Sequence, residues 1–303
     1  MTGTETDENG LKEKTTVALS SVIAAVGLTA FKIVVGVMTG SLGILAEAAH
    51  SGLDMVAALV TFLAVRISGK PADEEHLYGH GKVENLSALF ETLLLLATCV
   101  WIIYEAVQRL FYVSVAVEVS AWSFLVMATS IVIDISRSRM LYRAARKYNS
   151  QALEADALHF STDIWSSSVV ILGLTGMLVA RLVPSLTFLE KADSISALVV
   201  ALIVVYVSFQ LGLRTVKALL DTAPEGLNEK IIEAVKTVEG VSHCHRVRVR
   251  YAGPHIFVDL HVEVKGTRTL NKVHGLTHEV INAVRKALPG ADVTVHAEPL
   301  DEL

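Results

Sequence analysis

Six long apolar stretches constrain the fold of this chain more than any other feature of its sequence. Windows of about 20 apolar residues are long enough to cross the hydrocarbon core of a bilayer as helices. They cover residues 16–38, 42–67, 86–110, 115–135, 153–182 and 195–213. Only 19% of the 303 residues are charged, against about 25% in soluble proteins. We therefore predict an α-helical membrane protein with six transmembrane helices.

Lysine and arginine are unevenly distributed between the two sides of these windows. The segments after the second and sixth windows are basic, and the segment after the fourth is densest, with Arg137, Arg139, Arg143, Arg146 and Lys147. The remaining connections carry only Arg109, Arg181 and Lys191. Because cytoplasmic loops carry the excess of basic residues, we predict that both termini are cytoplasmic.

The N-terminal residues 1–14 are polar and acidic, without the apolar segment of a signal peptide. We expect a disordered cytoplasmic N-terminus here, followed by a transmembrane domain over residues 15–218. The missing signal and the compact length fit a prokaryotic inner membrane. No basic run in the sequence suggests binding to nucleic acid.

Beyond residue 218 the apolar stretches shorten and charged residues return, which indicates a second domain over residues 219–303. Its two central segments alternate apolar and polar residues, as half-buried strands do. The predicted elements are helix, strand, strand, helix and strand, over residues 227–238, 247–251, 256–264, 269–288 and 292–296. This order suggests a cytoplasmic α+β domain with a ferredoxin-like arrangement.

Two predicted spans carry the same pair of ionisable residues, His50 with Asp54 and His159 with Asp163. Residues four apart share one face of a helix, and each such group costs about 2.5–3.5 kcal/mol at membrane depth. A hydrogen bond between helices could explain one polar residue, but less readily a spacing repeated on two helices. Together the pairs offer two nitrogens and two oxygens, a donor set suited to tetrahedral Zn²⁺. A bound cation would also neutralise both buried carboxylates.

Five other charged residues lie within or beside the predicted spans. Lys32 and Glu91 are expected to pair inside the membrane or to reach toward its surface. Glu154 and Asp156 are expected at the cytoplasmic entrance, where a helix N-terminus favours negative charge. The spacing assigns no role to Asp134 in the fourth window.

Two further clusters of metal-binding side chains lie outside the spans. Asp73, His76 and His80 follow the second span closely and could form a loop site. Several of the tail histidines could assemble another site where strands meet at one edge. The tail holds His243, His245, His255, His261, His274, His278 and His296, together with Glu298.

These motifs resemble the cation diffusion facilitator family of divalent-metal/proton antiporters. The similar segments are Gly40-Ser-x-x-x-x-Ala-Glu-x-x-His50-Ser-x-x-Asp54, Asp73-x-x-His76-x-x-Gly-His80-Gly-Lys82-x-Glu84, Ala155-Asp-Ala-Leu-His159-x-x-x-Asp163, Leu219-Leu-Asp221 and Val293-Thr-Val-His296-x-Glu-Pro299. The resemblance covers nearly the whole chain from about residue 15. It implies a homodimer with six spans and a ferredoxin-like cytoplasmic domain.

The resemblance also implies roles for the polar clusters. His50, Asp54, His159 and Asp163 would form the transport site, and Asp73, His76 and His80 the loop site. The cytoplasmic regulatory site would comprise His245, His261, His274, His296 and Glu298. Lys82 and Asp221 would form a charged contact between the membrane and cytoplasmic domains. Glu298 stands where some relatives have aspartate.

The predicted function is proton-coupled efflux of Zn²⁺ by a secondary transporter, with no enzymatic reaction and no organic cofactor. The same antiporter with Fe²⁺, Cd²⁺, Co²⁺ or Mn²⁺ as its main substrate is one alternative. A membrane-bound zinc sensor that signals through its tail is another, but it gives the intramembrane pairs no purpose. An intramembrane metalloenzyme is disfavoured because four protein ligands would close the position that a catalytic metal keeps open.

Overall fold

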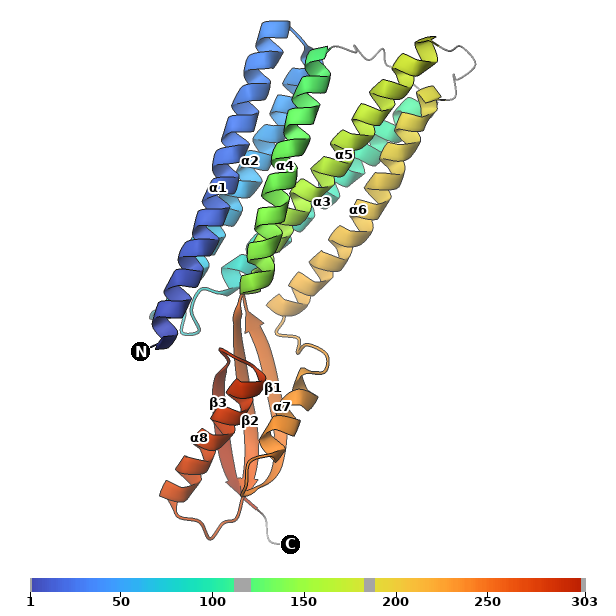
Figure 1. The fold of residues 1–303 in the computed structure, drawn as a ribbon. Helices are drawn as coiled ribbons and strands as arrows, with labels where there is room; N and C mark the ends of the chain where they lie inside the picture. The colour runs from blue at the N-terminus through green and yellow to red at the C-terminus, as the bar shows by residue number, and fades with distance from the viewer. Residues whose placement is uncertain (1, 112–120, 183–188, 301–303) are drawn as a thin grey trace.

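The computed structural model describes residues 2–111, 121–182 and 189–300, which form a helical bundle and a smaller α+β domain at one end of it (Figure 1). The bundle contains α1 (Thr2–Thr39), α2 (Leu42–Ser68), α3 (Lys82–Phe111), α4 (Ala121–Tyr148), α5 (Gln151–Leu182) and α6 (Leu189–Leu219). The predicted start of the fourth span and parts of the connections before α4 and α6 lie outside the described residues. Both ends of the described chain lie on the side of the α+β domain (Figure 1).

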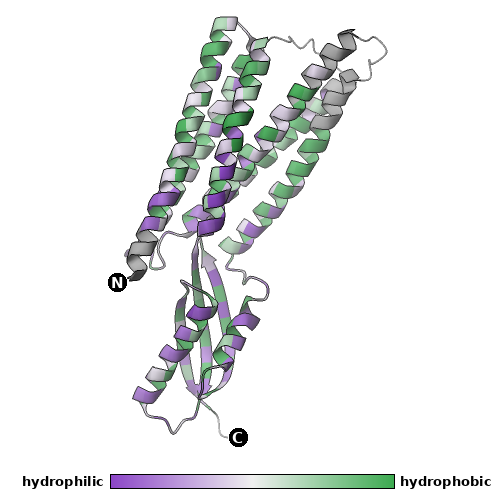
Figure 2. Ribbon diagram, in the orientation of Figure 1, coloured by the Kyte–Doolittle hydropathy of each residue, from purple (hydrophilic) through white to green (hydrophobic). Residues whose placement is uncertain are grey.

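Apolar residues dominate the surface of the bundle, and the polar residues gather toward the α+β domain (Figure 2). Four stretches among the described residues are long and apolar enough to cross a membrane: Asn9–Thr39, Glu47–Ser68, Lys82–Gln108 and Leu198–Leu219. They belong to α1, α2, α3 and α6. The predicted fourth and fifth spans correspond to α4 and α5, which lie beside the others and carry the polar residues of the interior.

Several helices extend beyond the apolar windows from which they were predicted. The basic segment that we expected to be a loop after the fourth window is the last part of α4, which ends only at Tyr148. Arg214 and Lys217 likewise belong to α6. Hydropathy marks where a helix leaves lipid, whereas a helix itself continues as long as its residues favour it, and lysine and arginine do.

The first helix begins within the segment 1–14 that was expected to be disordered. Two side chains near its start tie it to the bundle. The exposed Glu13 carboxylate lies 2.6 Å from Lys147 Nζ and accepts a hydrogen bond from Tyr148. Lys14 Nζ lies 2.8 Å from Glu84 Oε1, and both side chains are buried.

The tail forms the predicted order of elements: α7 (Leu227–Lys236), β1 (Val241–Ala252), β2 (His255–Val264), α8 (Leu270–Ala287) and β3 (Asp292–Pro299). The sheet order is β1-β2-β3, with β1 antiparallel and β3 parallel to β2. Both helices pack on one sheet face, where Leu260 and Val262 contact a core that includes Ile231 of α7 and Val280 of α8. The opposite face carries Asp259 and His261. The predicted fold class is confirmed.

Candidate metal sites

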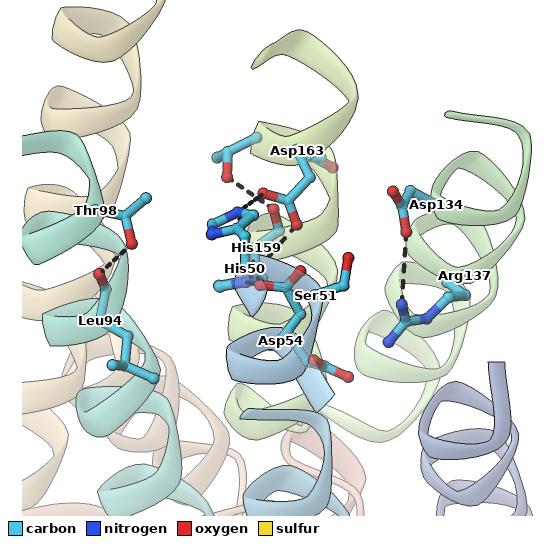
Figure 3. Close-up of polar contacts among 12 residues, drawn as sticks. His50, Ser51, Asp54, Leu94, Thr98, Asp134, Arg137, His159 and Asp163 are labelled. Atoms are coloured by element: carbon cyan, nitrogen blue, oxygen red, sulfur yellow. Dashed lines mark hydrogen bonds and ion pairs between the residues drawn. The ribbon is translucent and has the colours of Figure 1, made fainter. Parts of the chain in front are cut away.

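The two predicted His-Asp pairs meet inside the bundle, because α2 and α5 pack with these faces toward each other (Figure 3). His159 Nε2 lies 3.0 Å from Asp54 Oδ1 and 3.7 Å from Asp163 Oδ2. His50 Nε2 lies 3.8 Å from Asp163 Oδ1 and 3.9 Å from Asp54 Oδ1. Four potential ligands from two helices therefore converge on one point.

These four residues, the central cluster, are shielded from solvent to different degrees. Asp54 and His159 are 8% and 4% exposed, whereas the His50 side chain is 39% exposed. Two small cavities adjoin the central cluster. One is lined by residues of α3, α5 and α6, including Cys99 and Thr98, and the other by residues of α1, α2, α4 and α5.

A second layer of charged residues surrounds the central cluster. The Arg137 guanidinium lies 3.4 Å from the centre of the Phe160 ring, and its Nη2 donates to Ser21 Oγ at 3.1 Å. Asp134 Oδ1 lies 3.5 Å from Arg137 Nη1, so the residue without a predicted role has a buried partner (Figure 3). Sequence reasoning missed Arg137 because it was assigned to a loop. Its spacing of three from Asp134 was the available signal.

The remaining charged residues of the bundle are paired as well. Lys32 Nζ donates to Ser51 Oγ at 2.8 Å and lies 3.3 Å from Glu47 Oε2, and Glu91 accepts a hydrogen bond from Thr61. Asp156, expected at the entrance, is instead fully buried. It lies three residues before His159 and so shares the inward face of α5.

The loop cluster, Asp73, His76 and His80, is assembled at the surface between α2 and α3. Asp73 Oδ1 lies 3.3 Å from His76 Nδ1, and Asp73 Oδ2 lies 3.4 Å from His80 Nε2. Backbone hydrogen bonds to the carboxylate, chiefly from His76 N at 2.7 Å, hold the pKa of Asp73 below its ordinary value. The three side chains are close enough to share one ion.

The tail cluster comprises four of the five predicted residues and lies on the sheet face opposite the helices. His245, His261 and His296 are in register on the three neighbouring strands. Their rings surround the Glu298 carboxylate, at 3.3 Å, 2.8 Å and 3.5 Å respectively. The hydrogen bond from the His261 ring holds the pKa of Glu298 below its ordinary value.

His274, the fifth predicted tail ligand, is not part of this cluster within the chain. It lies on α8, which packs against the other face of the sheet. Helical spacing shows which residues share a face of α8, but it does not show which sheet face the helix covers. The prediction is therefore wrong for a site formed by one chain.

The tail domain is joined to the loop and to α3 by a tight junction. Lys82 Nζ lies 2.8 Å from Asp221 Oδ1, which is the predicted charged contact. Arg250 of β1 stacks on the Tyr78 ring at 3.9 Å, and Gly253 N donates to Asn85 Oδ1 at 2.9 Å. The loop cluster and the tail hairpin are therefore held together.

The backbone approach at this junction predicts that Gly81→Ala weakens the protein. A Cβ atom on Gly81 would lie 2.1 Å from the Ala252 carbonyl oxygen, a backbone atom that cannot rotate away. Overpacking of this kind costs about 1–3 kcal/mol, which thermal unfolding in detergent would measure. Gly27→Ala is the matched control, since a Cβ there meets nothing within 4 Å. Equal stability of the two variants would contradict the tight junction.

A bundle of apolar helices with ionisable side chains converging in its interior is the architecture of an ion-transporting membrane protein. Comparison with known proteins gives the family. Residues 18–220 match the cation efflux transmembrane domain, and residues 223–300 match the cation efflux protein cytoplasmic domain. The chain therefore belongs to the cation diffusion facilitator family, as predicted, and is an integral membrane protein of the cation-efflux type.

Full-length relatives agree with this assignment. The cation-efflux pump FieF of Pectobacterium atrosepticum is 32% identical over 288 residues, which cover 92% of each chain. The protein of the same name from Serratia proteamaculans is 32% identical over 291 residues, or 93% of this chain and 91% of the relative. A solved structure named MamM CTD is 28% identical and covers 25% of this chain and 96% of its own, with a TM-score of 0.25.

Proposed function

We propose that this protein exports Zn²⁺ from the cytoplasm in exchange for protons, as a homodimer that works by alternating access. The observation that carries the proposal is the convergence of His50, Asp54, His159 and Asp163 from two helices in the bundle interior. These residues would hold the transported ion. Two imidazoles and two carboxylates match the tetrahedral preference of Zn²⁺.

The donor set also bears on the other candidate substrates. Imidazole suits Zn²⁺, Co²⁺ and Fe²⁺, whereas Mn²⁺ favours sites richer in oxygen. We therefore place Zn²⁺ first and Mn²⁺ last among the divalent ions. The listed relatives are named cation-efflux pumps, which supports export as the direction of transport.

Proton exchange follows from the chemistry of these ligands. Imidazole and carboxylate bind a metal only in their deprotonated forms, so metal and protons compete for the same four side chains. Zn²⁺ would enter from the cytoplasmic side, and protons from the opposite side would displace it after the helices rearrange. The junction of Lys82 with Asp221 would keep the tail domain attached during this movement.

The loop and tail clusters would bind Zn²⁺ in the cytoplasm and regulate transport. Ion binding that favours one conformation shifts the population toward it. The proposed orientation has both termini and the tail domain in the cytoplasm, probed by the basic ends of α4 and α6 on that side. Bacterial relatives support an inner-membrane location.

The pH dependence of transport tests this proposal. Purified protein in liposomes should move Zn²⁺ toward the more acidic compartment when a pH gradient is imposed, and this movement should collapse when a proton carrier dissipates the gradient. Zinc-sensitive dye in the liposomes would record the flux. Zn²⁺ movement that ignores the gradient would contradict proton exchange, and no movement at all would favour the sensor.

A further inference from the structure

Two exposed histidines on α8 form a pair that none of the clusters above includes. His274 and His278 are four residues apart, so their side chains leave the helix on the same face. Their Nε2 atoms lie 3.3 Å apart, and both residues are exposed. The buried face of α8 is formed by Leu276, Val280 and Val284. The pair therefore contributes nothing to the core of the domain.

The separation of the two nitrogens matches what one metal ion requires. Two nitrogen ligands at about 2.0–2.1 Å from a tetrahedral Zn²⁺ lie about 3.3–3.4 Å from each other. The observed Nε2–Nε2 separation of 3.3 Å needs no rearrangement of the helix. We propose that His274 and His278 form a separate two-histidine site for a divalent transition-metal ion.

The site is independent of the tail cluster. His245, His261 and His296 lie on the sheet face that α7 and α8 do not cover, whereas the pair lies on the outer side of α8. An ion held by the pair cannot at the same time be held by the tail cluster of the same chain. The two sites should therefore fill separately.

The chemistry of two imidazoles defines the class of ion. Neutral imidazole suits Zn²⁺, Co²⁺, Ni²⁺ and Cu²⁺, whereas Mg²⁺ and Ca²⁺ require oxygen ligands. Two protein ligands leave two tetrahedral positions for water or for a donor from another molecule. The pair should therefore bind its ion reversibly and exchange it with the solvent.

The competing explanation is a plain hydrogen bond between two neutral rings. One Nε2 would carry the proton and the other would accept it, which the separation of 3.3 Å also permits. Such a pair would have no affinity for metal. The two explanations differ in how many ions the protein binds.

The test uses the full chain in detergent with the three other clusters disabled by Asp163→Ala, His80→Ala and His261→Ala. Equilibrium dialysis against Zn²⁺ measures the ions bound per chain, and circular dichroism checks that each variant is folded. We expect His278→Ala to remove one ion. His274→Ala should remove the same ion, so that the double variant loses no more than either single variant.

His255→Ala is the matched control, because His255 is an exposed histidine of the same domain outside both clusters. It should leave the ion count unchanged. An unchanged count in folded His278→Ala would overturn the proposal and favour the hydrogen bond, as would separate losses that add in the double variant. Because the parent chain lacks a transport ligand, the result does not depend on whether the protein transports Zn²⁺.

Discussion

Asp163→Ala should reduce Zn²⁺ flux into proteoliposomes by more than about 100-fold, to the background of empty liposomes. Loss of a residue that merely orients a metal ligand typically costs 10–100-fold in affinity or activity, and Asp163 is proposed as a ligand itself. The variant removes the carboxylate that lies 3.7 Å from His159 and 3.8 Å from His50. Three ligands from the two helices would remain.

Thr175→Val is the matched control for this prediction. Thr175 lies on the same helix, is exposed, and its hydroxyl donates to the Ile171 carbonyl within α5. It should transport at the wild-type rate. The Asp163→Ala protein should also elute as a folded species during size-exclusion chromatography. Wild-type flux in a folded Asp163→Ala protein would remove this residue from the transport site.

The second large effect concerns stability and arises from the buried ion pair of Lys14 with Glu84. Glu84 is fully buried and Lys14 is 6% exposed. The same carboxylate also accepts hydrogen bonds from Ser68 and Ser150. Glu84→Gln should destabilise the protein by about 3–5 kcal/mol, because it leaves the ammonium group buried without its counter-charge. Unfolding in detergent would measure the loss.

Two comparisons separate this electrostatic effect from a simple loss of packing. The double variant Lys14→Met with Glu84→Gln should recover much of the stability, since no unpaired buried charge remains. Glu13→Gln removes the partner of Lys147 in an exposed pair and should change the stability little, because water screens that pair. If Glu84→Gln and Glu13→Gln unfold alike, the buried pair has no special role.

The central cluster could be predicted from the sequence because its information is local. Spacing of four residues fixes which side chains share a helix face, and the cost of charge in lipid indicates that such faces point inward. The strands of the tail were predictable for the same reason, since alternation places His261 opposite Leu260 and Val262. Each of these inferences needs only one element.

The errors concern relations that no single element contains. Arg137 was assigned to a loop because hydropathy does not record that α4 continues and packs its basic end against α1. His274 was grouped with His261 because the sequence does not reveal which sheet face α8 covers. The contact of Gly81 with Ala252 depends on the docking of two domains and leaves no periodic signal.

The most direct test of the transport site is the position of the ion itself. Crystals of the full chain grown with Zn²⁺ should show anomalous scattering between α2 and α5, with His50, Asp54, His159 and Asp163 each about 2.0–2.2 Å from the peak. The site should empty in Asp163→Ala while the loop and tail peaks persist. Anomalous peaks confined to the loop, tail and α8 histidines would contradict the account.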